Sequence, residues 1–192
     1  METLVFGGSF NPPTVAHQAI ITACLKRPQT QEVWVMPSGE RADKRHALDD
    51  TDRLNMLHAM HHEVFNTDRR IVISWFELDY MTRPTQTWRT VKALAEYYAD
   101  KDFRFIFGAD AYQNMPTWDH GDRLRKELKI AVVPRSGYDL AAVSSVEILP
   151  LEIDQNTSST EVRRMRAAGL PIGHLVCQSI ANYIEEGGLY RP

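Results

Sequence analysis

The chain has 192 residues, a length that can bury a substantial hydrophobic core and still fit one domain. Its apolar fraction of 43%, charged fraction of 24% and net charge of −3 are ordinary for a globular protein. We therefore expect a single domain over residues 1–192, without a disordered tail and without a surface that binds nucleic acid.

Short apolar runs alternate along the chain with longer segments of helical period, a pattern typical of consecutive β-α-β units. In chain order the predicted elements are strand 3–6, helix 15–26, strand 33–36, helix 51–64, strand 71–75, helix 87–98, strands 103–107, 130–133 and 146–149, and helices 159–168 and 175–185. Several strands are almost continuously apolar, which indicates burial on both faces. The pattern predicts an α/β fold: a mostly parallel sheet with helices on both faces and a ligand crevice beyond the carboxyl ends of the strands.

The first strand ends in Gly7 and Gly8, and a helix is predicted to begin near Thr14. Two glycines let backbone amides approach a phosphate closely, because no Cβ intervenes. The helix that follows aims its unpaired N–H groups and positive dipole end at the same point. Thr14 and His17 lie three positions apart, so a hydroxyl and an imidazole share one helix face there. The turn therefore predicts a phosphate site, although a plain capped turn with a surface histidine has the same local pattern.

A second polar motif, TSSTEVRRM, lies near the other end of the chain. Ser158 can cap a helix while Glu161 returns the bond in a capping box, so an ordinary helix start explains part of this motif. The number of donors exceeds that explanation, because the hydroxyls of Ser159 and Thr160, the helix amides and the Arg163 guanidinium can all bind one anion.

Other features indicate no further site. The only cysteines, Cys24 and Cys177, lie far apart and outside any C-x-x-C pattern. His58, His61 and His62 have a helical spacing that can bind metal, but without a neighbouring carboxylate or cysteine we interpret them as a solvated helix face. The basic stretch 123–129 is short and interrupted, so it predicts an exposed helix and not an RNA site.

No signal peptide or membrane span is recognisable, since no segment reaches roughly 18 apolar residues. We expect a cytoplasmic protein with two reduced thiols and no membrane partner. The sequence does not determine the oligomeric state and is compatible with a homo-oligomer.

The first motif, GGSFNPPTVAH, resembles the signature of the adenylyltransferases of the nucleotidyltransferase α/β-phosphodiesterase superfamily, a glycine-rich strand end followed by F-[DN]-P and [HT]-x-G-H. The matching positions are Gly7, Gly8, Phe10, Asn11, Pro12, Thr14 and His17. Ala16 occupies the usual glycine position and adds one methyl group. The late motif resembles the superfamily's [IV]-S-S-T-x-x-R element, which the resemblance assigns to the ATP phosphates.

Over essentially the whole chain the resemblance narrows to the bacterial nicotinate-nucleotide adenylyltransferases. FELDYMTRPTQTWRTV is similar to their E-L-x-R-x-x-P-S-Y-T-x-x-T-L segment, and FGADAYQNMPTW resembles their segment with a glycine, an aspartate and a later tryptophan. VVPRSGY and ANYIEEGGLY resemble their basic loop and their usual C-terminus. The resemblance implies a Rossmann-like sheet, with Asp110 near the nucleotide ribose and Trp118 stacked on the pyridine ring. A tryptophan here can also simply anchor a loop on the core.

Departures from this family lie in the part that selects the acceptor. Gln86 replaces the usual tyrosine, Thr85 the serine and Tyr80 the arginine. The usual Pro-Pro-His-Lys loop is replaced by PSGERADKRH, in which Lys44 and its neighbours supply positive charge. The implied acceptor is nicotinate mononucleotide, with nicotinamide mononucleotide or 4′-phosphopantetheine as alternatives. A nucleotide-binding module without catalysis is the alternative of a different class.

Motifs and resemblance together assign the site residues. Catalysis is assigned to His17, Thr14 and Arg163. ATP binding is assigned to Gly7, Gly8, Ser9, Phe10, His17, Lys44, Gly108, Asp110, Ser158, Ser159, Thr160 and Arg163. Acceptor binding is assigned to Asn11, Thr85, Gln86, Thr87, Trp118 and Arg135. No residue is assigned to a metal, because there is no dense carboxylate cluster, and Mg²⁺ is expected to arrive with ATP.

The implied reaction needs little covalent help from the protein. The acceptor phosphate is already a competent nucleophile towards the α-phosphorus of ATP, so positioning and charge neutralisation suffice. His17 is expected to donate to the α-phosphate, Thr14 and the amides of residues 7–9 to hold the phosphates, and Mg²⁺ to bridge the leaving pyrophosphate. Arg163 and Lys44 are expected to neutralise the outer phosphates.

Overall fold

The computed structural model describes residues 1–40, 46–135, 137–138, 146–151 and 157–191. Its centre is a sheet of six parallel strands in the order β3-β2-β1-β4-β5-β6, counted over the described residues. The strands are β1 (Glu2–Gly8), β2 (Thr30–Pro37), β3 (Ile71–Ile73), β4 (Phe103–Gly108), β5 (Ile130–Val133) and β6 (Glu147–Ile148). The strand order reverses between β1 and β4, which is where doubly wound sheets bind ligands. The predicted Rossmann-like parallel sheet is confirmed.

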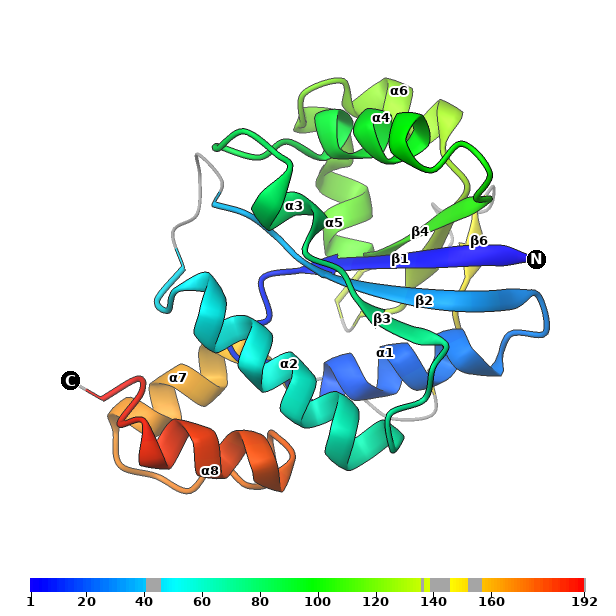
Figure 1. The fold of residues 1–192 in the computed structure, drawn as a ribbon. Coiled ribbons are helices and arrows are strands. Elements are labelled where there is room, and N and C mark those ends of the chain that lie inside the picture. The colour runs from blue at the N-terminus through cyan, green and yellow to red at the C-terminus, as the bar shows by residue number, and fades with distance from the viewer. Residues whose placement is uncertain (41–45, 136, 139–145, 152–156, 192) are drawn as a thin grey trace.

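Helices cover both faces of this sheet. They are α1 (Val15–Lys26), α2 (Asp50–Phe65), α3 (Phe76–Asp79), α4 (Thr87–Tyr97), α5 (Ala109–Asn114), α6 (Gly121–Glu127), α7 (Ser159–Ala167) and α8 (Gln178–Glu186), with a 3₁₀ turn η1 (Met115–Thr117). In Figure 1, α1, α2, α7 and α8 lie below the sheet, and α3, α4, α5 and α6 lie above it. No described helix combines the length and apolarity that a membrane crossing requires.

Successive residues of β1 build two separate cores. Leu4 and Phe6 pack below the sheet with Ile21, while Val5 packs above it with Leu94 and other residues of the upper helices. This alternation follows from the pleat of a strand, which points neighbouring side chains to opposite faces. Continuous apolarity in the strands therefore correctly predicted burial on both faces.

Several predicted elements differ from the observed ones at their ends. The last helix begins at Gln178 and not at 175, because Leu175 and Val176 are buried in the preceding loop and the Leu175 carbonyl accepts the Val15 N–H at 3.0 Å. The strand predicted to reach residue 75 ends at Ile73, where the chain turns into α3 and leaves Trp75 47% exposed. The strand predicted over 146–149 is reduced to β6.

Several short helices were not predicted, namely α3, α5 and η1. They are too short to show a helical period in sequence. The basic stretch 123–129 does form an exposed helix, α6, displaced by two residues. Cys24 and Cys177 are free, and burial raises the pKa of both thiols, that of Cys24 to about 12. Both are therefore poor nucleophiles.

Candidate active site

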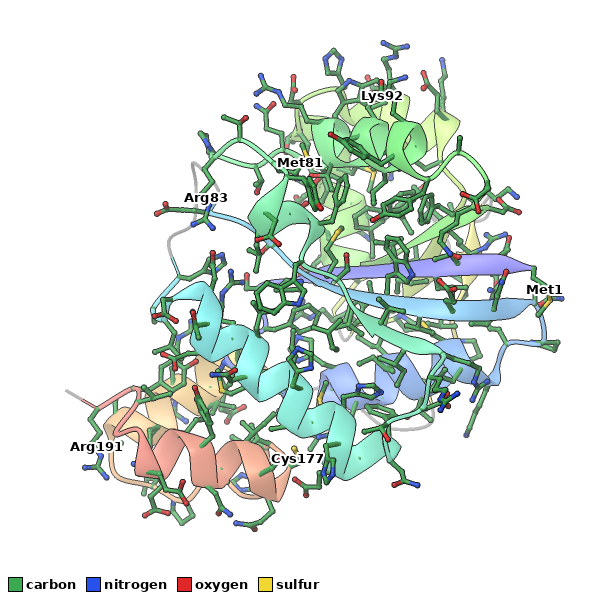
Figure 2. The ribbon with its side chains drawn as sticks, in the orientation of Figure 1. Met1, Met81, Arg83, Lys92, Cys177 and Arg191 are labelled. Carbon is green, nitrogen blue, oxygen red and sulfur yellow. The ribbon has the colours of Figure 1, made fainter. Side chains whose placement is uncertain are left out.

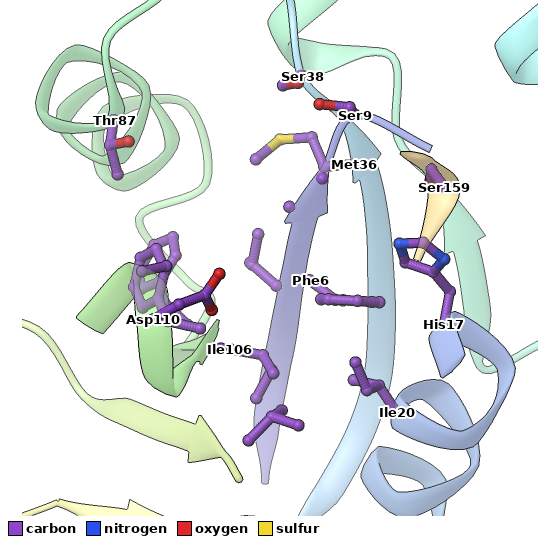
Figure 3. A pocket seen from close by; sticks show the side chains of 18 of the residues that line it. Phe6, Ser9, His17, Ile20, Met36, Ser38, Thr87, Ile106, Asp110 and Ser159 are labelled. Carbon is purple, nitrogen blue, oxygen red and sulfur yellow. The ribbon is translucent and has the colours of Figure 1, made fainter. Parts of the chain in front are cut away.

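A cavity of about 920 Å³ lies at the carboxyl ends of β1, β2, β4 and β5, shown in Figure 3. It brings together residues from both ends of the chain, since His17 and Arg163 line the same space. The assigned residues that line it are Gly7, Gly8, Ser9, Asn11, His17, Thr85, Gln86, Thr87, Gly108, Asp110, Trp118, Arg135, Ser158, Ser159, Thr160 and Arg163. Phe10 and Thr14 are fully buried and do not line it, and Lys44 lies outside the described residues.

The glycine turn is packed onto a buried phenylalanine. Phe10 has a φ of +45° and no exposed surface, and its ring lies 5.4 Å from that of Phe6 and 5.0 Å from that of His17. A Cβ on Gly8 would lie 3.1 Å from the Phe10 ring. Glycine at position 8 therefore lets the chain pass closely over Phe10, which supports the imidazole from behind.

Thr14 and His17 contact each other at the start of α1. The backbone N–H of Thr14 donates to Nδ1 of His17 at 2.9 Å, and the Thr14 hydroxyl lies 2.8 Å from the same nitrogen. Because Nδ1 accepts the amide hydrogen, the neutral imidazole carries its proton on Nε2. Thr14 reaches the cavity only through His17, so its position is that of a support for the imidazole. In Figure 3, His17 and Asp110 lie on opposite sides of β1.

The late motif is bonded directly to the early turn. Arg163 donates through Nη1 to the carbonyl of Asn11 at 2.7 Å and through Nη2 to the Thr160 hydroxyl at 3.2 Å. The Ser159 hydroxyl donates to the carbonyl of Pro12 at 2.8 Å. Two segments about 150 positions apart thus form one wall. Its helix amides, its guanidinium and the Thr160 hydroxyl are donors suited to an anion, whereas the Ser159 hydroxyl hydrogen is used by Pro12.

The predicted cap of α7 is also present. The Ser158 hydroxyl accepts the Glu161 N–H at 3.2 Å. Ser158 therefore has a structural partner as well as a place on the cavity wall.

The opposite side of the cavity is fixed by a buried carboxylate that the sequence did not identify as important to the site. Glu77 accepts the Gly39 N–H at 3.0 Å and the Thr90 hydroxyl at 2.8 Å, so it joins the end of β2 to α4. Thr85 donates its N–H to the Glu40 carbonyl at 2.9 Å. These bonds hold residues 85–87 against the cavity, where they were predicted to meet the acceptor.

Trp118 lines the cavity and also anchors its own loop. Its ring packs edge to face on Phe107 with the centroids 6.0 Å apart, and its carbonyl accepts the Gly121 N–H at 2.9 Å. A Cβ on Gly121 would lie 1.8 Å from the Met115 carbonyl oxygen. Only glycine fits there, so the position of Trp118 depends on Gly121. The structure therefore supports the interpretation of Trp118 as a loop anchor, and its stacking on the pyridine ring stays a prediction.

Asp110 and Arg135 form an ion pair, with Oδ2 and Nη1 2.5 Å apart. One was assigned to ATP and the other to the acceptor, and the structure places both on the same rim. A Cβ on Gly108 would lie 2.5 Å from Oδ1 of Asp110. Glycine at the end of β4 therefore makes room for this carboxylate.

A buried arginine, Arg53, supports the glycine turn and was not predicted from the sequence. Arg53 has no exposed surface and donates to the Ser9 carbonyl at 2.9 Å and to Asp50 at 2.6 Å. Arg83, which lies above the start of α2 in Figure 2, also contacts Asp50. Burial opposes the ionisation of Asp50, but the hydrogen bonds from both arginines outweigh it and lower the pKa of Asp50. A signal existed, since Arg53 continues the buried stripe of Met56, Leu57 and Met60.

The described residues contain no group of three or more histidine, cysteine or acidic side chains placed to hold a metal ion. Of the carboxylates on the cavity, Glu77 and Asp110 have the protein partners given above. A Mg²⁺ ion that arrives with ATP, held mainly by phosphates and water, stays a prediction.

A model of the cytidylyltransferase-like family matches residues 5–165. Together with the doubly wound sheet and the cavity at its switch point, this match defines the chain as a member of the cytidylyltransferase-like class.

Full-length relatives define the family within that class. The chain is 33% identical over 194 residues to the probable nicotinate-nucleotide adenylyltransferase of Chlorobaculum tepidum, covering 99% of each chain. It is 30% identical over 195 residues to that of Chlorobaculum parvum, covering 100% of each. The chain belongs to the nicotinate-nucleotide adenylyltransferase family, as its motifs indicated.

Solved structures agree on the fold. The nicotinic acid mononucleotide adenylyltransferase of Plasmodium falciparum complexed with NaAD superimposes with a TM-score of 0.87 at 22% identity, covering 99% of this chain and 98% of that one. A complex of the same protein with APC gives a TM-score of 0.84 at 21% identity, covering 98% and 96%.

Proposed function

We propose that this protein transfers the AMP part of ATP to nicotinate mononucleotide, giving nicotinate adenine dinucleotide and pyrophosphate in NAD biosynthesis. The observation that carries the proposal is the single cavity shared by the His17 turn, the Arg163 helix and Trp118. Its volume of about 920 Å³ is at the upper end of small-molecule sites, as a dinucleotide product requires. The names of the full-length relatives support the same acceptor.

His17 is proposed as the donor to the reacting phosphate. Its Nε2–H group can meet negative charge that builds on the α-phosphate as the acceptor phosphate attacks. The Nδ1 contact with Thr14 fixes the ring before substrate binds, so little reorganisation is needed in the transition state. Arg163 and the start of α7 are proposed to neutralise the outer phosphates.

The far side of the cavity is proposed to hold the acceptor. Trp118 offers a flat ring to the electron-poor pyridine, and residues 85–87 lie at the start of α4, where backbone N–H groups have no helical partner. Mg²⁺ is proposed to enter as part of the ATP substrate and to balance the charge of the leaving pyrophosphate. A cytoplasmic location belongs to the same proposal.

The test is an acceptor panel with the purified protein, ATP and Mg²⁺. Nicotinate mononucleotide, nicotinamide mononucleotide and 4′-phosphopantetheine are compared by pyrophosphate release and product mass. We expect nicotinate adenine dinucleotide as the main product. A higher kcat/KM with either of the other acceptors would contradict the proposed substrate, and ATP binding without any transfer would favour a binding module.

A further inference from the structure

The last residues of the chain return to the cavity wall. After α8 the chain reverses at Gly188, with a φ of +61°, and the Leu189 N–H bonds the Ile184 carbonyl at 2.9 Å. In Figure 1 this segment lies beside α7. Tyr190, itself at a φ of +58°, then donates its hydroxyl to Oδ1 of Asn11 at 2.5 Å. A contact between residues 179 positions apart therefore joins the C-terminal segment to the first motif.

Asn11 is the residue through which this contact reaches the site. It lines the cavity, although only 4% of it is exposed, and its backbone carbonyl is held by Arg163 at 2.7 Å. Its side chain has one accepting oxygen and one donating NH₂ group on the same carbon. With the oxygen bonded to Tyr190, the NH₂ group is the end that is left for a ligand.

The direction of this amide matters because the ligand is anionic. An amide turned by 180° would present its oxygen to a phosphate, and two acceptors facing each other repel. Burial raises the pKa of the Tyr190 hydroxyl, which therefore stays protonated and able to donate at neutral pH.

We propose that Tyr190 is a positioning residue for the transfer reaction: its hydroxyl holds the Asn11 amide so that the NH₂ group faces a nucleotide phosphate in the cavity. The C-terminal segment thus contributes to the site as well as to the fold. This inference rests on the proposed function, because the phosphate is that of a nucleotide substrate. Tyr190 itself does not line the cavity, so it acts only through Asn11.

The test begins with Tyr190→Phe, which keeps the ring and removes only the oxygen. Tyr183→Phe is the matched control, because Tyr183 lies on α8 and also gives its hydroxyl to a side chain, Asp52 at 2.8 Å, away from the cavity. With nicotinate mononucleotide and ATP, we expect kcat/KM to fall about tenfold in Tyr190→Phe and to change less than twofold in Tyr183→Phe. The two melting temperatures should be similar.

A double-mutant cycle separates positioning from general stability. If Tyr190 acts through Asn11, Tyr190→Phe should have almost no further effect on kcat/KM in an Asn11→Ala background. Additive losses would overturn the inference, as would near-normal activity of Tyr190→Phe or failure of that variant to fold, since the hydroxyl would then serve the fold alone. The wild-type protein is assayed first, because its inactivity would count against the proposed function and not against this contact.

Discussion

The imidazole of His17 is fixed at the cavity wall by two buried neighbours, Thr14 and Phe10. Thr14 supplies both its backbone N–H and its hydroxyl to Nδ1, while the Phe10 ring packs against the imidazole 5.0 Å away. The two buried residues, Phe10 and Thr14, thus determine the direction of a third that lines the cavity. A donor that is oriented in advance stabilises the transition state more strongly, because the protein does not have to reorganise around it during the reaction.

Replacing His17 by alanine tests how much this donor contributes to the reaction rate. Loss of one preorganised donor should reduce kcat by about 10² or more while the protein stays folded. The control is His58→Ala, which removes an exposed imidazole from α2. Turnover and melting temperature are measured for both variants, and near-normal turnover of His17→Ala would remove this residue from the mechanism.

Gly121 gives a second prediction at the residue scale. A Cβ at this position overlaps the Met115 carbonyl, so Gly121→Ala must displace the loop that carries Trp118. We expect a loss of stability of about 2 kcal/mol or more and a raised KM for the pyridine nucleotide. Gly173→Ala is the matched control, because no atom lies within 4 Å of its added Cβ. Chemical denaturation and acceptor titration of both variants check the prediction. Equal KM values would show that the Trp118 loop does not contribute to acceptor binding.

Helix α2 lies outside the cavity and links the glycine turn to the segment that contains residues 85–87. Arg53 on its first turn holds the Ser9 carbonyl of the glycine turn, and Asp50 beside it also contacts Arg83, close to residues 85–87. The position of the glycine turn therefore depends on a helix that contributes no described residue to the cavity wall.

Arg53→Lys keeps the charge but cannot reproduce two hydrogen bonds in a fixed plane. We expect the KM for ATP to rise about tenfold, because the Ser9 carbonyl loses its donor, and we expect a loss of about 1–3 kcal/mol in stability. Arg83→Gln removes only the exposed contact with Asp50 and should leave the ATP KM nearly unchanged. ATP titration and urea unfolding measure both effects, and an unaltered ATP KM in Arg53→Lys would contradict the link.

At the element scale, prediction from the sequence succeeded where the hydrophobic pattern runs over many consecutive residues. The principal strands and the long helices were predictable, because apolar runs and 3.6-residue stripes are written into consecutive residues. The glycine turn and the capped α7 were recognisable for the same reason, and they do meet at one cavity. Short α3 and α5 carry no such period. The roles of Arg53, Glu77 and Tyr190 were not predictable, since each depends on partners 13 to 179 positions away.

In the whole molecule, the cavity and a cluster of ion pairs lie at opposite ends of the sheet. The cavity occupies the carboxyl ends of the strands, while a group of four charges lies at the opposite end around Glu2, the first residue of β1. Glu2 binds Arg104 of β4 at 2.8 Å and Arg27, just after α1, at 3.1 Å, and Arg27 also binds Glu147 of β6 at 2.7 Å. This group ties three strands and a helix together without contacting the site.

The charged group predicts how stability depends on pH. Hydrogen bonds from Arg104 and then Arg27 outweigh the cost of burial and lower the pKa of Glu2 from 4.5 to about 2. A carboxyl with a lowered pKa in the folded state adds stability that is complete above pH 4.5 and is lost as the pH falls towards 2, an effect of about 3 kcal/mol at most.

Glu2→Gln should therefore destabilise the protein at pH 7, and its difference from wild type should shrink on acidification towards pH 2.5, as followed by urea unfolding. Because Glu2 lies at the far end of β1 from the cavity, kcat/KM at pH 7 and 25 °C should stay within twofold of wild type. A difference in stability that does not change with pH would show that packing of the side chain, and not its charge, is what Glu2 contributes. A large loss of activity in a folded variant would instead show that the two ends of the sheet are coupled.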